Sequence, residues 1–160
     1  MSVETKTDLR EETLEKVQQL VQANVDAKLA LGDGVASIED PILAKAMNLM
    51  ATLSAKRNAE LSAWVRANKE HPKNVGTWLG AWRRIWADIR SGLTAKDVSA
   101  VLNDVERSQQ HLITLYQEIV LETAGSAMND VLHRQLAEIG TTLDSIHELQ
   151  EQYNAQSEGS

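Results

Sequence analysis

Four stretches of about 30 residues repeat apolar side chains at steps of three and four residues. They cover about 8–37, 41–70, 95–123 and 127–155, most of the 160-residue chain. This spacing places the apolar side chains along one face of an α-helix, and 30 helical residues extend about 45 Å. Only two prolines and eight glycines interrupt the chain. The sequence therefore predicts an all-α protein.

Helix-start signals support these boundaries. Asp8 and Glu11 have the spacing of a capping box, in which each side chain accepts a hydrogen bond from a free amide. Asp40 is a cap residue followed by a proline, which is favourable at the first helical position. The first stretch contains Gly32 and Gly34, each of which weakens a helix by about 1 kcal/mol relative to alanine. We still expect this helix to continue to about residue 37, because the apolar phase is kept beyond both glycines.

The connections between the stretches predict the topology. The first and second stretches are joined by a short connection, as are the third and fourth, so each pair forms antiparallel neighbours. The segment 71–94 is long enough to travel the length of the helices. One long crossover predicts a ferritin-like four-helix bundle. We expect residues 1–160 to form this single domain, with flexible tails at 1–7 and 156–160.

A short fifth helix is expected at about 76–91, within the crossover. It carries three of the four tryptophans, Trp78, Trp82 and Trp86, on one stripe. We expect this stripe to pack against the bundle, because each indole buries on the order of 200 Å². The alternatives are a stacking platform for single-stranded nucleic acid or a helix on a membrane surface.

The distribution of charge suggests which partners are favoured. The net charge of −7 opposes binding to nucleic acid. Residues 66–96 carry seven Lys or Arg against two acids, a net charge of +5, whereas residues 97–160 carry two against eleven, a net charge of −9. The basic segment is therefore expected to pair with the chain itself or with a second copy. Binding of the basic segment to DNA or RNA is a further alternative.

Three further features favour a cytoplasmic protein. The polar, acidic N-terminus does not resemble a secretory signal. No run of about 18 apolar residues predicts a membrane span. The absence of cysteine excludes disulfides and thiolate metal sites.

A resemblance to a family is carried by the segments EDPILAKAMNLMATLSAKRNAELSAWV, GTWLGAWRRIWADI and AVLNDVERSQQHLITLYQEI, and HRQLAEIGTTLDSIHELQ continues it. These segments resemble the ferritin-like four-helix-bundle domain of unknown function that is widespread in bacteria. The resemblance covers roughly residues 14–150. It rests on Asp40-Pro41, Arg57, Gly76, Gly80, Trp86, Glu106 and Tyr116.

The resemblance raises the question of a di-iron site, which ferritin-like bundles build from inward Glu and Glu-x-x-His groups. Relatives often have Glu-x-x-Glu in the third long helix and a His-Asp pair in the fourth. Here these positions are Glu106 with Gln109 and Leu143 with Asp144, and the inward glutamate of the first helix falls at Leu29. The resemblance therefore implies a ligand set that is largely lost, and we expect no metal and no cofactor. If a metal binds, the candidate ligands are Glu106, Asp144 and His147.

The histidines do not suggest a second site. Asp130 and His133 share a helix face, and so do Asp144 and His147. The two histidines are 14 residues apart, about 21 Å along a helix, so they cannot share a metal ion. We expect both, together with His71 and His111, on the surface.

Polar residues within the apolar seams suggest a buried cluster. Arg57 keeps the apolar phase of the second helix, and Glu106 that of the third. A buried guanidinium requires a carboxylate and further acceptors. We therefore expect Arg57 to pair with Glu106, in a structural cluster completed by Gln109, Asn24 and Tyr116.

These observations favour a protein that is not an enzyme. The sequence shows no phosphate-binding glycine loop and no arrangement of nucleophile and base. We expect a helical protein that acts through association, as a homodimer or larger homo-oligomer or with a protein partner. The alternative is a metal-binding protein, ferroxidase-like or for storage. A stress-related role is implied only by analogy with ferritin-like proteins.

Overall fold

Four long helices make up the part of the chain that the structure describes, a computed structural model covering residues 4–35, 38–73 and 95–158. They are α1 (Glu11–Val35), α2 (Pro41–Ala67), α4 (Ala95–Glu122) and α5 (Asn129–Glu158). Within these ranges no strand occurs, and one isolated bridge joins Thr5 and Asp8. The prediction of an all-α protein is confirmed. The expected fifth helix at 76–91 lies outside the described residues.

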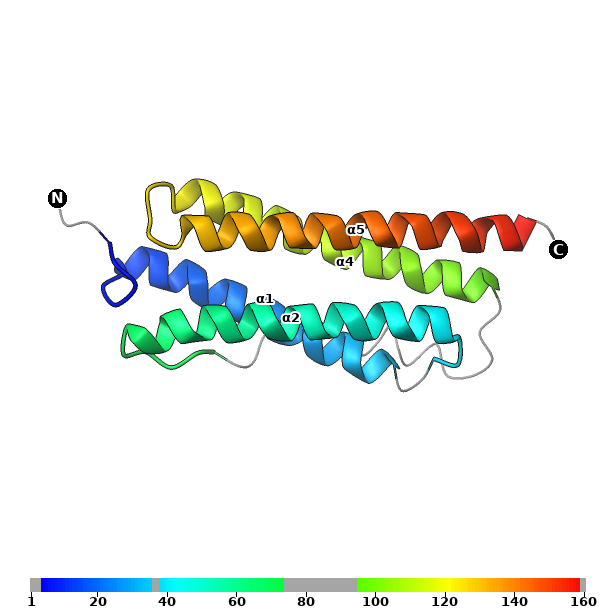
Figure 1. Cartoon of the computed structure of the whole chain (residues 1–160), viewed down its shortest axis with the longest axis horizontal. Helices are drawn as coiled ribbons and strands as arrows, with labels where there is room; N and C mark the ends of the chain where they lie inside the picture. Colours follow the sequence, from blue (N-terminus) through cyan, green and yellow to red (C-terminus); the bar gives the residue numbers. More distant parts are fainter. Residues whose placement is uncertain (1–3, 36–37, 74–94, 159–160) are drawn as a thin grey trace.

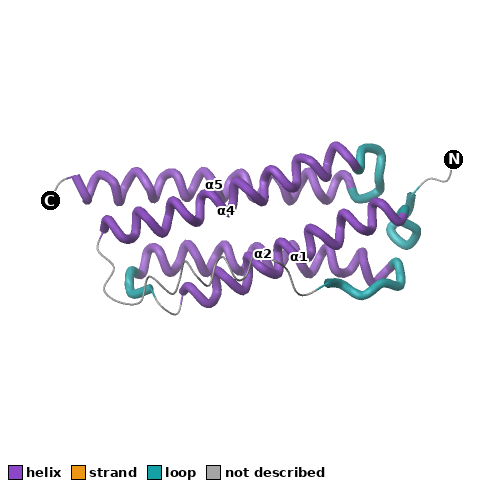
Figure 2. The backbone as a smooth tube through the Cα atoms, turned by 180° about the vertical axis from the view of Figure 1, so that it is seen from behind, coloured by secondary structure: helices purple, strands orange, loops and turns teal. Residues whose placement is uncertain are grey.

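The helices are arranged as two antiparallel hairpins, α1 with α2 and α4 with α5 (Figure 1). The view from behind shows the same pairs side by side (Figure 2). Helix α2 ends at one end of the molecule and α4 begins at the other, so the connection between them joins opposite ends. The chain direction is therefore up, down, down, up, as the lengths of the connections predicted.

The start of α2 confirms the predicted cap. The Asp40 carboxylate accepts hydrogen bonds from the amides of Ile42 and Leu43, both at 3.0 Å, and Pro41 follows as the first helical residue. The same carboxylate oxygen accepts a hydrogen bond of 2.7 Å from the Tyr153 hydroxyl. Asp40 thus satisfies free amides of α2 and also ties this helix end to α5.

The predicted cap of α1 is wrong. Asp8 forms the isolated backbone bridge with Thr5, and the helix begins only at Glu11. The carboxylate that serves this helix end belongs to Glu4, which accepts from the Arg10 amide at 2.9 Å and from the Thr13 hydroxyl at 2.7 Å. The local spacing suggested Asp8. The chain turns back before α1, so that the carboxylate of Glu4 reaches the Arg10 amide and the Thr13 hydroxyl.

Residues 4–10 pack against the helices, so residues 4–7 differ from the flexible tail expected at 1–7. The Glu4 side chain is buried, and the Lys6 ammonium lies 5.5 Å from the centre of the Trp64 ring. The Asn68 side chain accepts from the Leu9 amide and donates to the Lys6 carbonyl. These contacts fasten the segment to the end of α2.

The other helix boundaries differ from the expected ones by a few residues. Helix α1 continues through Gly32 and Gly34, as predicted, and ends at Val35. Helix α2 ends at Ala67, before the expected boundary at 70. Helix α5 continues to Glu158, beyond the expected start of the tail at 156. None of the four helices contains an apolar run that would span a bilayer.

The interior contains two apolar clusters with a polar layer between them. One cluster includes Leu61 of α2 and Leu112 of α4, and the other includes Ala51 and Val105 of the same helices. Both clusters also contain residues of α1 and α5. The buried residues between the two clusters on α2 and α4 include the polar residues Ser54, Arg57 and Gln109. This layer is the most unusual feature of the interior.

Candidate functional site

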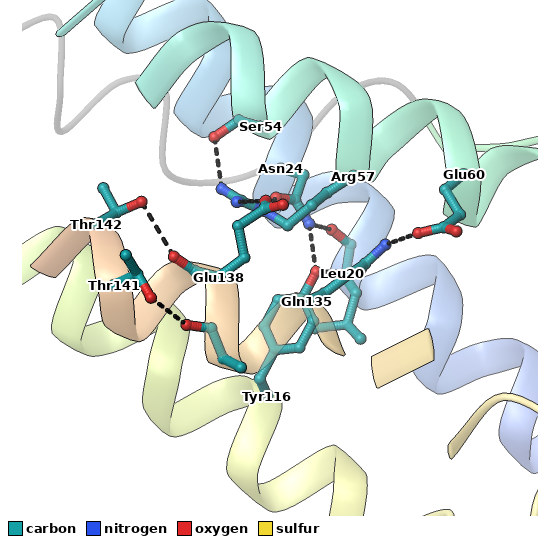
Figure 3. Close-up of polar contacts among 11 residues, drawn as sticks. Leu20, Asn24, Ser54, Arg57, Glu60, Tyr116, Gln135, Glu138, Thr141 and Thr142 are labelled. Carbon is teal, nitrogen blue, oxygen red and sulfur yellow. Dashed lines mark hydrogen bonds and ion pairs between the residues drawn. The ribbon is translucent and has the colours of Figure 1, made fainter. Parts of the chain in front are cut away.

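The polar layer is centred on Arg57, which is only 3% exposed. The hydrogen-bonded side chains of this layer come from all four helices and extend across the interior (Figure 3). We call this group the Arg57 cluster, and it consists of Asn24, Ser54, Arg57, Tyr116, Gln135 and Glu138.

The Arg57 guanidinium donates from all three of its nitrogens. Nε donates to Asn24 Oδ1 at 2.9 Å, and Nη2 donates to Ser54 Oγ at 3.0 Å. Nη1 donates to Glu138 Oε1 at 2.6 Å, and this contact is also an ion pair. A buried charge is strongly unfavourable unless it is paired and its remaining donors are satisfied. The three acceptors meet this requirement, so Arg57 belongs to the fold as a charged residue.

Asn24 and Tyr116 continue the cluster from α1 to α4. Asn24 Nδ2 donates to the Leu20 carbonyl and to Tyr116 Oη, both at 2.9 Å. The Tyr116 hydroxyl in turn donates to Gln135 Oε1 at 2.7 Å. Burial raises the pKa of Tyr116, because the charged form would lose its hydration. The hydroxyl therefore stays protonated and acts as a donor at neutral pH.

Gln135 connects the Arg57 cluster back to α2. Its Nε2 donates to Glu60 Oε1 at 2.8 Å, and the other Glu60 oxygen pairs with Arg134. With the Arg57–Glu138 pair, these contacts give three polar connections between α2 and α5. The contacts therefore form a closed circuit through all four helices, which fixes their relative positions.

The predicted members of the cluster are only partly confirmed. Asn24, Arg57 and Tyr116 are joined as expected. The predicted partner of Arg57, Glu106, is wrong, because Glu138 of α5 contacts the guanidinium instead. Glu106 faces the C-terminal half of α5, so a different set of side chains lies within its reach.

Glu106 forms a separate contact between α4 and α5. It accepts from Gln150 Nε2 at 2.7 Å, and its other oxygen lies 2.9 Å from His147 Nε2. These hydrogen bonds, first from Gln150 and then from His147, hold the pKa of Glu106 below its ordinary value. The carboxylate is therefore ionised at neutral pH.

Gln109 lies in the polar layer but outside the Arg57 cluster. The side chain is 1% exposed, and neither its amide nitrogen nor its amide oxygen has a hydrogen-bond partner among the described residues. An unpaired buried amide is unfavourable by roughly 1–3 kcal/mol. The prediction that Gln109 completes the cluster is therefore wrong.

The candidate metal ligands are only partly brought together. Glu106 and His147 are in contact, whereas Asp144 is exposed and takes no part in this contact. Leu29, at the position of the inward glutamate that the resemblance implied, is 38% exposed. Among the described residues, no group of three or more His, Asp or Glu side chains has the geometry of a metal site. All four histidines are exposed, as predicted.

Sequence reasoning missed Ser54, Gln135 and Glu138. A signal for two of them was present on α5, because Gln135 continues the buried phase between Leu132 and Ile139, and Glu138 follows Gln135 by three residues. Residues three apart share a helix face. A polar residue in the apolar phase of α5 thus marked the helix that supplies the partner of Arg57.

The expected packing of Trp78, Trp82 and Trp86 concerns residues outside the described ranges. The fourth tryptophan, Trp64, is partly buried against the apolar cluster that contains Leu61.

Comparison with known proteins gives one match. Residues 12–122 match the family described as "Domain of unknown function (DUF2383)". No curated protein and no solved structure matches the chain. The matched segment extends from the start of α1 to the end of α4, more than half of the chain, and it includes Asn24, Arg57 and Tyr116. The chain therefore belongs to the DUF2383 family.

Proposed function

We propose that this protein is a ferritin-like four-helix bundle without enzymatic activity, which acts by association with itself, as a homodimer or larger homo-oligomer, or with a protein partner. The up, down, down, up order of the helices supports the ferritin-like topology. The crossover connects opposite ends of the molecule, as this topology requires.

The observation that carries the proposal is the buried guanidinium of Arg57. It occupies the polar layer between the helices, where a ferritin-like protein with a metal centre holds its ligands. A second positive charge at about 4 Å would be repelled by about 4 kcal/mol at an effective dielectric constant of 20. One carboxylate of the layer, Glu138, is already paired with Arg57. The buried polar layer therefore stabilises the fold, and we place the proposed function at the surface.

Native mass measurement of the untagged protein, combined with elemental analysis, tests the proposal. We expect the mass of two or more chains, and metal far below one ion per chain. A strictly monomeric protein at high concentration would contradict self-association.

Metal binding is the second candidate function. The contact between Glu106 and His147 favours it, because it places a carboxylate and an imidazole nitrogen 2.9 Å apart, and both groups are common ligands. Stoichiometric iron, manganese or zinc that is lost in Glu106→Ala would reverse the order of the two candidates. The matched variant Asp130→Ala, with an exposed carboxylate at the other end of α5, should leave the metal content unchanged.

A further inference from the structure

A surface groove lies between the N-terminal half of α2 and the middle of α5. Its volume is about 280 Å³, and its lining is largely apolar. The apolar side chains that form it include Leu49, Met50, Leu53, Ile146 and Leu149. It adjoins the Arg57 cluster, because Glu138 lines it too.

Two large apolar side chains on α2 are exposed beside this groove. Leu49 is 59% exposed and Ile42 is 53% exposed. Ile42, Ala46, Leu49 and Leu53 follow one another at steps of four, three and four residues. They therefore form one stripe along the helix. Three of its residues, Ala46, Leu49 and Leu53, line the groove, so the stripe forms the α2 side of the groove. The exposed Leu49 beside a recess gives the two parts of a self-complementary surface.

The parts of α2 and α5 that border the groove carry opposite charge. Residues 41–59 of α2 contain Lys45, Lys56 and the buried Arg57, and no acid. Residues 139–158 of α5 contain four acids and no Lys or Arg, and these acids are Asp144, Glu148, Glu151 and Glu158. The positive charges beside the groove therefore lie on α2, and the negative charges lie on α5. Two copies can bring the positive half of one against the negative half of the other.

The register of α2 and α5 shows which charges would meet. The contacts Arg57–Glu138 and Gln135–Glu60 align the two antiparallel helices. Continued along both helices, this register places Lys45 level with Gln150. Lys45 therefore lies at the level of Glu148 and Glu151, within one helical turn of each.

We propose that the α2/α5 groove is the homodimer interface of this protein, which specifies the self-association of the proposed function and rests on it. A twofold axis along the groove places α2 of one copy on α5 of the other, at the same level. In this arrangement Leu49 enters the groove of the second copy, and Lys45 faces Glu148 of that copy. Each contact occurs twice, as in every isologous interface.

The size of the stripe indicates a reversible dimer. From Ile42 to Leu53 the stripe is about 17 Å long, so the interface lies at the small end of the range for stable complexes. We therefore expect dissociation in the micromolar range, within reach of sedimentation velocity.

Sedimentation velocity of the untagged full chain over a concentration series tests the interface. We expect a monomer–dimer equilibrium, and at least a tenfold weaker association for Leu49→Glu. The matched control is Leu121→Glu, because Leu121 is an even more exposed leucine, at 78%, near the end of α4 and outside the groove. This control should associate as the unchanged protein does. Thermal melts of both variants establish that the helices remain folded.

Charge reversal tests the twofold arrangement. Lys45→Glu and Glu148→Lys should each weaken the dimer, and the double variant should restore it, because opposite charges then face one another again. High salt should weaken the unchanged dimer and the restored one alike.

The possible results distinguish the two proposals. A protein that dimerises equally well with Leu49→Glu would overturn the groove as the interface and leave self-association in place. A chain that stays monomeric at every concentration would overturn the groove as a dimer interface and, with it, the self-association in the proposed function. Failure of the double charge variant to restore the dimer would overturn the twofold arrangement.

Discussion

At the level of single residues, Arg57 is a buried charge that requires a counter-ion. Its charge is buried, and Glu138 is the only carboxylate among the hydrogen-bond acceptors described for it. Glu138→Ala should lower the free energy of unfolding by about 2 kcal/mol, because it leaves the buried charge without its counter-ion. This value is below that of a fully buried pair, since the Glu138 side chain is 35% exposed and partly screened by solvent. Urea unfolding followed by circular dichroism measures the change.

Glu106→Ala is the matched control for this prediction. Glu106 also accepts hydrogen bonds from α5, but its ion pair with His147 lies at the surface. Exposed pairs contribute about 0–1 kcal/mol, so this variant should remain close to the unchanged protein. If both variants lost the same stability, Arg57 would not depend on Glu138 in particular.

Gln109 provides a prediction of the opposite sign. Its buried amide has no hydrogen-bond partner in the part of the chain that the structure describes, so Gln109→Met should raise the free energy of unfolding by about 1 kcal/mol at nearly constant volume. Gln135 is equally buried but bonded to Tyr116 and Glu60. Gln135→Met should therefore destabilise the fold. Urea denaturation of the two variants compares the signs directly, and a loss of stability in both would indicate that Gln109 is also satisfied.

The residues of the cluster could be predicted only in part. Arg57, Asn24 and Tyr116 were recognised because polar side chains in an apolar phase must find partners inside. The partner carboxylate was assigned to the wrong helix because periodicity places a residue on a face without fixing which neighbouring helix meets that face. Arginine and glutamate are long side chains, so small rotations of a helix decide which pair forms.

At the level of elements, Asp40 joins the start of α2 to α5. Asp40→Ala removes two capping hydrogen bonds and the bond from Tyr153, and should lower the free energy of unfolding by about 2 kcal/mol. Tyr153→Phe removes only the bond between the helices and should have about half this effect. Thermal and urea unfolding of the two variants separate the capping contribution from the interhelical one.

The contribution of Asp40 should depend on pH. Burial raises the pKa of this carboxyl, but the hydrogen bonds from Tyr153, Leu43 and Ile42 outweigh burial and hold the pKa below its ordinary value of 3.8. Because the folded state binds this proton less tightly than the unfolded state, the stabilisation is complete above 3.8 and is lost as the pH falls through the folded pKa. The difference between the unchanged protein and Asp40→Ala should therefore shrink in acid. A constant difference would exclude this linkage.

The elements were more predictable than the contacts between them. Asp40-Pro41 is a local signal, and its cap lies where the sequence placed it. The start of α1 depends instead on Glu4 and on a segment held by Asn68, which is 59 residues from Leu9 along the chain. No local spacing reports such a contact, so the cap was assigned to Asp8.

At the level of the whole molecule, the polar layer divides the interior into two apolar clusters joined by the same four helices. An apolar seam tolerates sliding by a helical turn, whereas the Arg57 cluster has one arrangement that satisfies its buried donors. The cluster therefore specifies how the two hairpins align, which is a recognised role of buried polar groups. That alignment also positions α2 against α5 along the groove. The interior network and the proposed interface thus depend on the same register.

The separation between the start and the middle of α1 leads to a prediction about coupling. Thr13, which donates to Glu4, and Asn24, which accepts from Arg57, are eleven residues apart, about 17 Å along the helix. Thr13→Val and Glu138→Ala share no partner, so their effects on the free energy of unfolding should add within about 0.5 kcal/mol.

Ser54→Ala and Glu138→Ala both remove acceptors of Arg57 and should deviate from additivity by about 0.5–3 kcal/mol. Urea unfolding of both double-mutant cycles tests this. Additivity in the second cycle would mean that the Arg57 cluster does not act as one unit. Coupling in the first cycle would mean that the N-terminal segment and the polar layer are energetically coupled along α1.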